Sequence, residues 1–467
     1  MTQLLEQFSV YNNLVSKPDA QENPLHDLLP DDFDHGWSVA RNRSKPLNHL
    51  DFIKSKEKLA IELNLHNQHT SPALFDANYG LLEKHQAGII PTPTVIKHLT
   101  SQLQNVGKAL SENDVVEKLR EYATIRHMEF HPSDVCNLTC CGCTYGHDDP
   151  ARKPLPINFP FDEIHKMAQM KPQSMVIIGG GEPTLYRNGR HHFQDTVDEI
   201  CHTNQGITLA LVTNGTYKPA GDWPDRLSWM RLSLDAASEE TYTGFRGKPM
   251  FRRVIQNYLE YLEYDVKYVG ISFLFARSNV HDYANVARFI FDLVKQEKPH
   301  ALHKVNIQYR PLRRDPYLYD KPFTQAVANE QVTKAVSEVR ELADSSEEMK
   351  AFLKNQTNIT AILGGNSHPP HEFARCYYSQ TFRIVRANGD LRPCFIRVSE
   401  SDFVLGNIKT DSLEKIALNT IFVGSKRKPH CDAHGCRQCH VNYTFEHGLI
   451  GNLQPSNSPE VLADPMY

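Results

Sequence analysis

Short apolar runs alternate with amphipathic segments between residues 124 and 310, and this alternation constrains the fold more than any other feature of the chain. The pattern is typical of successive βα units that share one parallel sheet. We predict an amphipathic helix over 161–170 and another over 283–294. The six predicted strands cover residues 125–131, 174–178, 207–213, 230–234, 268–275 and 304–309. Six such units form either an open doubly wound sheet or a partial barrel, and periodicity alone does not separate these two folds.

The segments on either side of this region differ from it in composition. The chain has 467 residues, which is more than one hydrophobic core usually serves. Residues 1–123 are predicted to form a surface arm, up to about residue 50, followed by a helical region. In that region an apolar stripe predicts one helix and Ser111 caps the start of another; the stripe consists of Ile96, Leu99, Leu103, Val106 and Leu110. Further predicted units are a helical connector over 322–375 and a tail over 446–467, with a cysteine-rich module between them.

Composition and charge exclude several functional classes. With 40% hydrophobic and 23% charged residues, the chain has no apolar run near the roughly 18 residues of a membrane span. The start, MTQLLEQFSVYNN, lacks the basic and apolar regions of a secretion signal, so we expect a cytoplasmic protein. A net charge of -4 makes nucleic acid an unlikely partner.

The cysteines fall into two groups. Four of the ten lie at positions 136–143, five lie at 376–439, and Cys201 stands apart. Without a secretion signal, grouped cysteines are more naturally metal ligands than disulfide partners. Two groups of thiols therefore predict two inorganic sites.

The first group has the spacing CxxxCxxC in the segment HPSDVCNLTCCGCTYGHD, which directly follows the first predicted strand. Cys136, Cys140 and Cys143 can hold an iron-sulfur cubane and leave one iron open to a small molecule. The alternative is a structural zinc site, for which Cys141 or His147 could provide the fourth ligand.

The second predicted strand runs into GGGEPTL at residues 179–185, which places glycines and a carboxylate at the carboxyl end of a parallel strand. Following a βα unit that begins with CxxxCxxC, this motif resembles the radical S-adenosylmethionine (SAM) superfamily over residues 124–321. The resemblance implies an α/β fold, a partial (β/α)6 barrel of the TIM type, with a helical N-terminal extension.

The resemblance also implies a role for each matching residue. Cys136, Cys140 and Cys143 would bind a [4Fe-4S] cluster, whose fourth iron is chelated by the amino and carboxylate groups of SAM. The residues expected to contact SAM are Gly180, Gly181, Glu182, Thr213, Asn214, Ser233 and Arg246. Thr213 and Asn214 could instead form only a turn, and Arg246 could be only a surface charge.

Two positions near these motifs have further alternatives. Asp235 could contact SAM or simply start the next helix. The residue before the last cluster cysteine is often aromatic in the superfamily but is Gly142 here, so Tyr145 is the candidate to contact adenine.

The C-terminal cysteines resemble the SPASM or twitch module of radical SAM enzymes over residues 376–445. Cys376, Cys394, Cys436 and Cys439 would bind one auxiliary [4Fe-4S] cluster, and the alternative is a zinc ribbon with the same ligands. Cys431 is left over. It is a candidate hydrogen donor to a substrate radical, or else a small buried hydrophobic residue.

Polar residues alternate along the sixth predicted strand and so share one face. Asn306, Gln308 and Arg310 lie on that face, with Arg313 and Arg314 just after it. If the face looks into the barrel, Gln308 and Arg310 are substrate ligands, and Arg310 suits a carboxylate.

The resemblance predicts an enzyme that cleaves SAM to a 5′-deoxyadenosyl radical and takes hydrogen from a substrate. The first hypothesis is a peptide or protein substrate that is epimerised, cross-linked or oxidised. The second is oxidation or rearrangement of a small polar metabolite such as a sugar or cyclitol, and the third is a non-catalytic iron-sulfur scaffold. An enzyme of this kind also needs a low-potential reductant of the flavodoxin or ferredoxin type.

Overall fold

The computed structural model describes residues 24–28, 49–66, 71–148, 151, 153–312, 327–362, 376–394, 398 and 403–425. Within these residues the main sheet has nine strands, in the order β11-β10-β9-β1-β2-β5-β6-β7-β8. The strands of the main sheet are β1 (His127–Phe130), β2 (Ser174–Ile177), β5 (Thr208–Thr213), β6 (Trp229–Ser233), β7 (Tyr268–Phe275), β8 (Val305–Pro311), β9 (Phe382–Val385), β10 (Asp390–Arg392) and β11 (Gly406–Asn407). A separate hairpin joins β3 (Arg187–Asn188) to β4 (His191–His192).

The six predicted strands are all present, and their order decides between the two candidate folds. The strands β1, β2, β5, β6, β7 and β8 pair in parallel in the order in which they occur in the chain. A doubly wound sheet reverses its strand order at a switch point, whereas this order does not reverse. The right-handed crossovers therefore place the helices on one side, and the sheet forms a partial barrel.

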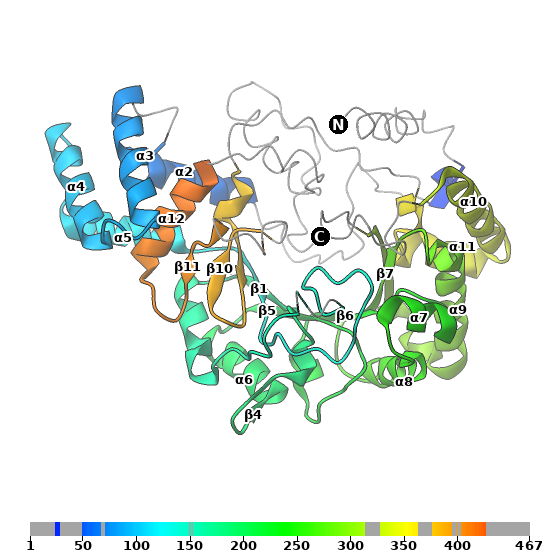
Figure 1. Ribbon diagram of the computed structural model, residues 1–467. Helices are drawn as coiled ribbons and strands as arrows, with labels where there is room; N and C mark the ends of the chain where they lie inside the picture. The colour runs from blue at the N-terminus through cyan, green and yellow to red at the C-terminus, as the bar shows by residue number, and fades with distance from the viewer. Residues whose placement is uncertain are drawn as a thin grey trace.

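Helices lie along the outer side of the sheet and at its two ends (Figure 1). The helices are α2 (His49–Glu62), α3 (Pro72–Gln86), α4 (Thr92–Asn105), α5 (Glu112–Ala123), α6 (Phe193–Thr203), α7 (Glu239–Arg246), α8 (Phe251–Tyr261), α9 (Tyr283–Glu297), α10 (Asn329–Asp344), α11 (Glu347–Gln356) and α12 (Leu413–Ser425). Ser111 and Asp114 form the capping box that starts α5, as the sequence predicts. No helix in the described ranges is long and apolar enough to cross a membrane.

Two predicted helices differ from the structure. The stripe that begins at Ile96 does not continue to Leu110, because α4 ends at Asn105 and Gly107 turns the chain with φ +80°. Val106 is consequently 56% exposed. The segment Phe161–Met170 is a 3-10 helix, η2, which places residues three apart on one face. Its buried residues, Ile164, Met167 and Met170, have this spacing.

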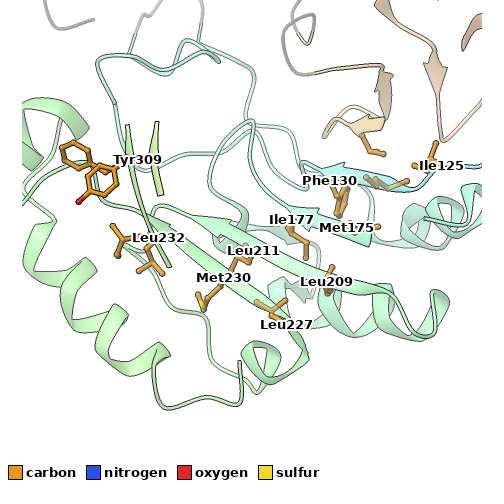
Figure 2. Packing of buried hydrophobic residues seen from close by; sticks show 14 of the residues in the cluster. Ile125, Phe130, Met175, Ile177, Leu209, Leu211, Leu227, Met230, Leu232 and Tyr309 are labelled. Carbon is orange, nitrogen blue, oxygen red and sulfur yellow. The ribbon is translucent and has the colours of Figure 1, made fainter. Parts of the chain in front are cut away.

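The hydrophobic core lies between the sheet and the helices that follow its strands. Figure 2 shows side chains of this core along the strands, among them Met175, Ile177, Leu209, Leu211, Met230, Leu232 and Tyr309. The alternate residues of these strands point to the inner face of the sheet. A second, smaller apolar cluster of Val176, Ala210, Val212 and Trp229 lies there.

The C-terminal module continues the barrel sheet. Strand β9 pairs in parallel with β1, so that Phe382 lies opposite His127 and Val385 opposite Phe130. Helix α12 packs on α5 and α3 of the N-terminal region, and Arg120 Nε donates to Glu414 Oε1 at 2.6 Å. Both ends of the described chain therefore support the first barrel strand.

Two neighbouring tyrosines test which face of β8 packs on the helices. The rings of Tyr283 and Tyr309 are 4.5 Å apart. The Tyr283 hydroxyl donates to the Ile359 carbonyl at 2.9 Å and accepts from the Ile362 amide at 3.0 Å, whereas the buried Tyr309 hydroxyl has no hydrogen-bond partner. We expect Tyr283→Phe to lower the free energy of unfolding by about 1–3 kcal/mol, and Tyr309→Phe to leave it unchanged or raise it slightly. Denaturant unfolding of the two variants measures this difference, and equal losses would contradict the orientation.

Candidate active site

Three loops meet at the carboxyl edge of the sheet. They follow the neighbouring parallel strands β1, β2 and β5, and the carboxyl ends of parallel strands share one edge. The loop after β1 carries the three cysteines, the loop after β2 carries GGGEP, and the loop after β5 carries Asn-Gly-Thr. The topology thus brings the sequence motifs together.

The cluster loop, residues 131–148, holds the three predicted ligands as half-buried thiols. Cys136 receives a backbone amide hydrogen bond from Leu138, and Cys143 receives amides from Tyr145 and His147. Burial raises the pKa of the Cys136 thiol to about 12 and also raises that of Cys143. Metal binding to these thiols therefore releases protons.

The donor set of the loop fits an iron-sulfur cluster. In a cubane each thiolate binds its own iron, and hydrogen bonds to the sulfurs tune the cluster. Cys136, Cys140 and Cys143 are free thiols, and the sulfurs of Cys136 and Cys143 have such amide donors.

The end of α7 supports the cluster loop from one side. The Cys141 amide donates to the Phe245 carbonyl at 3.0 Å, and Gly247 follows the helix with φ +79°. A Cβ atom on Gly247 would lie 2.3 Å from Thr139 Oγ1 and 2.6 Å from the Thr139 carbonyl oxygen. Glycine is therefore required where the chain passes the residue before Cys140.

Arg246, the last residue of α7, places a cation beside a predicted ligand. Its Nη1 donates to Cys140 Sγ at 3.5 Å, and its Nη2 forms an ion pair with the buried carboxylate of Asp235. Burial raises the pKa of Asp235, and the charge of Arg246 opposes that increase. Arg246 is thus a buried cation, and its contact with the SAM carboxylate stays a prediction.

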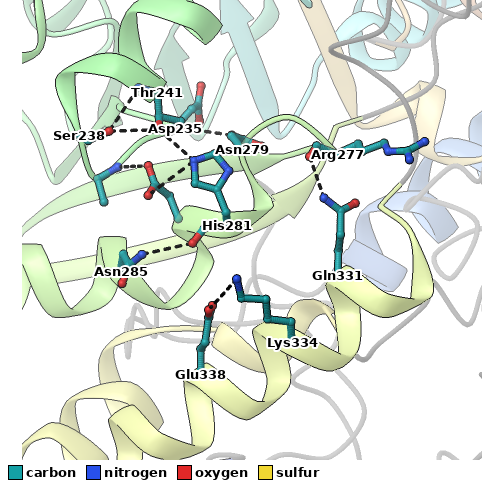
Figure 3. A network of polar contacts seen from close by, with 12 residues as sticks. Asp235, Ser238, Thr241, Arg277, Asn279, His281, Asn285, Gln331, Lys334 and Glu338 are labelled. Carbon is teal, nitrogen blue, oxygen red and sulfur yellow. Dashed lines mark hydrogen bonds and ion pairs between the residues drawn. The ribbon is translucent and has the colours of Figure 1, made fainter.

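Asp235 is held by the turn after β7 as well as by Arg246. Its Oδ1 accepts the Leu274 amide at 2.7 Å, and the Asn279 side chain donates to its carbonyl at 3.0 Å (Figure 3). Its backbone is left-handed, with φ 58°, a conformation in which aspartate is enriched among non-glycine residues. Asp235 anchors Arg246 and does not begin α7, whose N-cap is Ser238.

The glycines of GGGEP let this loop pack directly on the cluster loop. The Gly181 amide donates to the Ser133 carbonyl at 2.8 Å, and the Glu182 amide to the Val135 carbonyl at 2.7 Å. A Cβ atom on Gly181 would lie 2.2 Å from the Val135 carbonyl oxygen. The sequence predicts that these glycines let the backbone approach a ligand closely. In the structure Gly181 lets the glycine loop approach the backbone of the cluster loop.

Glu182 is a buried carboxylate that joins two of the loops. Its Oε1 accepts from Thr213 Oγ1 at 2.6 Å and from the amide and hydroxyl of Thr184, and its Oε2 accepts the Asn214 amide at 2.7 Å. Burial raises the pKa of Glu182, and these hydrogen bonds oppose the increase. Whether Glu182 also receives the SAM amino group stays a prediction.

Asn214 ties the third loop to the first. Its side-chain amide donates to Asn137 Oδ1 at 3.0 Å, and Asn137 donates to Thr216 Oγ1 at 2.8 Å. Asn137 follows Cys136 directly, so this pair holds the first ligand in place. Asn137 is not predicted from the sequence, because an asparagine beside a cysteine has no recognisable pattern.

His147, considered as a zinc ligand, has another partner. Its Nε2 donates to the Gly180 carbonyl oxygen at 2.8 Å, which fixes the proton on that nitrogen. His147 therefore links the end of the cluster loop to the glycine loop.

The predicted substrate residues lie on the inner face of β8. Val305, Ile307 and Tyr309 belong to the helix-side core, so the alternate residues Gln308 and Arg310 face the other way. Arg310 Nη2 donates to Ser272 Oγ at 3.0 Å. Gln308 Oε1 is buried without a hydrogen-bond partner. Ser233, the predicted ribose contact, pairs in register with Ser272, which places it beside this polar group.

The cysteine-rich module is described in part. Cys376 is half-buried, and its amide donates to the Gly424 carbonyl at 3.2 Å. Cys394 follows β10 and is also half-buried. Cys431, Cys436 and Cys439 lie outside the described residues, as do Arg313 and Arg314.

Two family models match the chain. The model of the radical SAM superfamily matches residues 130–290, and the SPASM model, an iron-sulfur cluster-binding domain, matches residues 376–440. The protein is therefore a radical SAM enzyme with a SPASM domain. Its cofactors are SAM, the [4Fe-4S] cluster of the barrel and an auxiliary iron-sulfur cluster of the C-terminal module.

Solved structures similar to this chain have low sequence identity to it. Streptococcus suis SuiB bound to S-adenosylmethionine is 14% identical, with 82% of this chain and 89% of that chain covered and a TM-score of 0.47. The structure of anSMEcpe with bound AdoMet is 20% identical over 67% of this chain and 90% of that chain, with a TM-score of 0.44. BtrN in complex with AdoMet and 2-DOIA is 11% identical over 67% and 90%, with a TM-score of 0.31. The comparison with curated proteins gives no match.

Substitutions at Gly247, just after α7, and at Gly244, within α7, test whether the end of this helix supports the cluster loop. We expect Gly247→Ala to reduce reconstituted iron by about half, because the added Cβ displaces Thr139 and only the auxiliary cluster assembles normally. Gly244 in α7 has nothing within 4 Å of an added Cβ, so Gly244→Ala should retain full iron content. Iron analysis after anaerobic reconstitution measures both, and a full complement in Gly247→Ala would contradict the account.

Proposed function

We propose that this enzyme cleaves SAM reductively and takes a hydrogen atom from a peptide or protein side chain, which is then epimerised, cross-linked or oxidised. The observation that carries the proposal is the inner face of β8. There the buried Gln308 Oε1 has no hydrogen-bond donor. Arg310 lies two residues further along the strand, on the same face. A peptide backbone supplies an amide donor for Gln308, and an acidic side chain or terminus supplies a carboxylate for Arg310.

The chain's own residues hold and orient the reacting groups. Cys136, Cys140 and Cys143 would hold the cluster, and the bound cluster would supply the one electron that splits SAM into methionine and the 5′-deoxyadenosyl radical. Glu182 and Asn214 keep the surrounding loops together through the bonds described above. The substrate carbon that lies nearest the radical reacts, so positioning by β8 determines the site of abstraction.

The auxiliary module also supports this proposal. In the superfamily such modules mostly accompany the modification of peptides or protein side chains, where the second cluster accepts an electron or binds the intermediate. A small polar metabolite is the alternative, because the serine, glutamine and arginine side chains would also bind hydroxyl groups. We further propose a flavodoxin or ferredoxin as the electron donor.

Anaerobic reconstitution with SAM and dithionite tests the first step. We expect 5′-deoxyadenosine to form, and Cys140→Ala to abolish it because one cluster ligand is lost. Cys201 lies on α6 and belongs to none of the three loops, so Cys201→Ala is the matched control and should retain the activity. Product formation that survives in Cys140→Ala would contradict the assignment of the ligand.

Iron content tests the second cluster. Two cubanes require about eight irons per chain, and replacement of Cys436 and Cys439 should leave about four. A wild-type protein with about four irons and one zinc would contradict an auxiliary cubane.

Deuterium transfer tests the substrate. A precursor peptide encoded beside the gene, deuterated at its side chains, should transfer deuterium into 5′-deoxyadenosine. Transfer from a deuterated metabolite but from no peptide would reject the peptide proposal and leave the SAM chemistry intact.

A further inference from the structure

Arg386 brings a side chain of the C-terminal module to the cluster loop. It follows β9 directly, and β9 lies beside β1 in parallel register. The two strands therefore end at the same edge of the sheet, where β1 leads into the cluster loop and β9 leads into the turn that begins with Arg386.

The guanidinium of Arg386 contacts both ends of the cluster loop. Its Nη2 lies 3.5 Å from Asp134 Oδ1, and its central carbon lies over the ring of Tyr145, 5.2 Å from the centroid. Asp134 precedes the first ligand by two residues, and Tyr145 follows the last ligand, Cys143, by two residues. One side chain therefore joins the two stems between which all three ligands lie.

Burial strengthens both contacts. The side chains of Arg386 and Asp134 are only 17% and 7% exposed, so their attraction is screened less than that of a surface pair. A Cβ atom on Gly180 would lie 2.0 Å from Asp134 Oδ1 and 3.7 Å from Arg386 Nη2. The glycine loop thus packs against the same ion pair.

Tyr145 also belongs to the hydrophobic contact between the modules. It packs against the apolar cluster formed by Ile53, Tyr377, Tyr378, Phe382, Ile384 and Val398, which Cys376 also contacts. Tyr145 is thus held from the module side, and its contact with adenine stays a prediction.

We propose that Arg386 is a positioning residue for the radical-generating cluster, by which the SPASM module closes the two stems of the cluster loop. The proposal goes beyond the substrate question, since it concerns the loop that holds the three thiolates. It assigns the module a role in the first half of the reaction in addition to that of its own cluster.

Hydrogen exchange of the reconstituted full-length enzyme tests this role without measuring activity. In Arg386→Met the amides of residues 134–147 should exchange about tenfold faster than in the wild type, which corresponds to about 1.4 kcal/mol of lost loop stability. Amides of α6 serve as the internal reference and should keep their rates. Arg386→Lys retains the charge but loses the planar contact with Tyr145, and should give an intermediate rate.

Two further variants keep the test decisive. Asp134→Asn removes the other half of the ion pair and should accelerate exchange as much as Arg386→Met does. It keeps the test available if Arg386→Met folds poorly. Lys415→Met breaks an ion pair of the same module, Lys415 to Asp411 at 2.8 Å, and should leave residues 134–147 unchanged. Wild-type exchange in both Arg386→Met and Asp134→Asn would overturn the proposal. Equal acceleration in α6 would also overturn it, because Arg386 would then stabilise the whole fold and not this loop.

SAM binding provides a second readout. Equilibrium dialysis with labelled SAM should show about tenfold weaker binding to Arg386→Met at unchanged iron content. Unchanged affinity together with unchanged exchange would show that the module does not position the cluster loop.

Discussion

The arrangement of the site depends on the hydrogen bonds of the buried residue Glu182. Its carboxylate accepts from Thr213 and Asn214 at the end of β5, and its backbone amide donates to the Val135 carbonyl in the cluster loop. A buried carboxylate without such donors would be costly, so the loops must stay together for the site to remain folded. Because β1, β2 and β5 are adjacent and parallel, the strand order itself delivers the three loops to this point.

The two ends of the described chain reinforce this edge from the other side of β1. Strand β9 extends the sheet next to β1, and α12 packs on α5, whose end leads into β1. Buried polar groups strengthen this contact: Lys56 of α2 donates to the Tyr122 carbonyl at 3.1 Å, and Arg383 of β9 donates to Thr420 of α12 at 2.8 Å. The described strands of the C-terminal module are therefore part of the same sheet as the barrel strands.

The sequence predicted the barrel strands, the capped start of α5 and the loops that carry the motifs, because apolar periodicity and cysteine or glycine spacing are local signals. It did not predict that β9 pairs with β1, since strand partners distant in the chain leave no local pattern. The roles of Asp235, Asn137 and Arg386 were missed for the same reason. Each acts through a partner that only the fold brings close. The predicted helix from Ile96 to Leu110 was too long, because Gly107 turns the chain although the apolar periodicity continues.

The central claim is that three thiolates leave one iron of the cluster free to bind SAM. Electron-nuclear double resonance of the reduced enzyme with SAM labelled by ¹⁵N at the methionine amino group tests it most directly. The account predicts a ¹⁵N hyperfine coupling between this nitrogen and the cluster, which should be replaced by a ¹⁴N signal with unlabelled SAM and should be lost in Cys140→Ala. A fully loaded cluster that shows no coupling to the amino nitrogen would contradict the account.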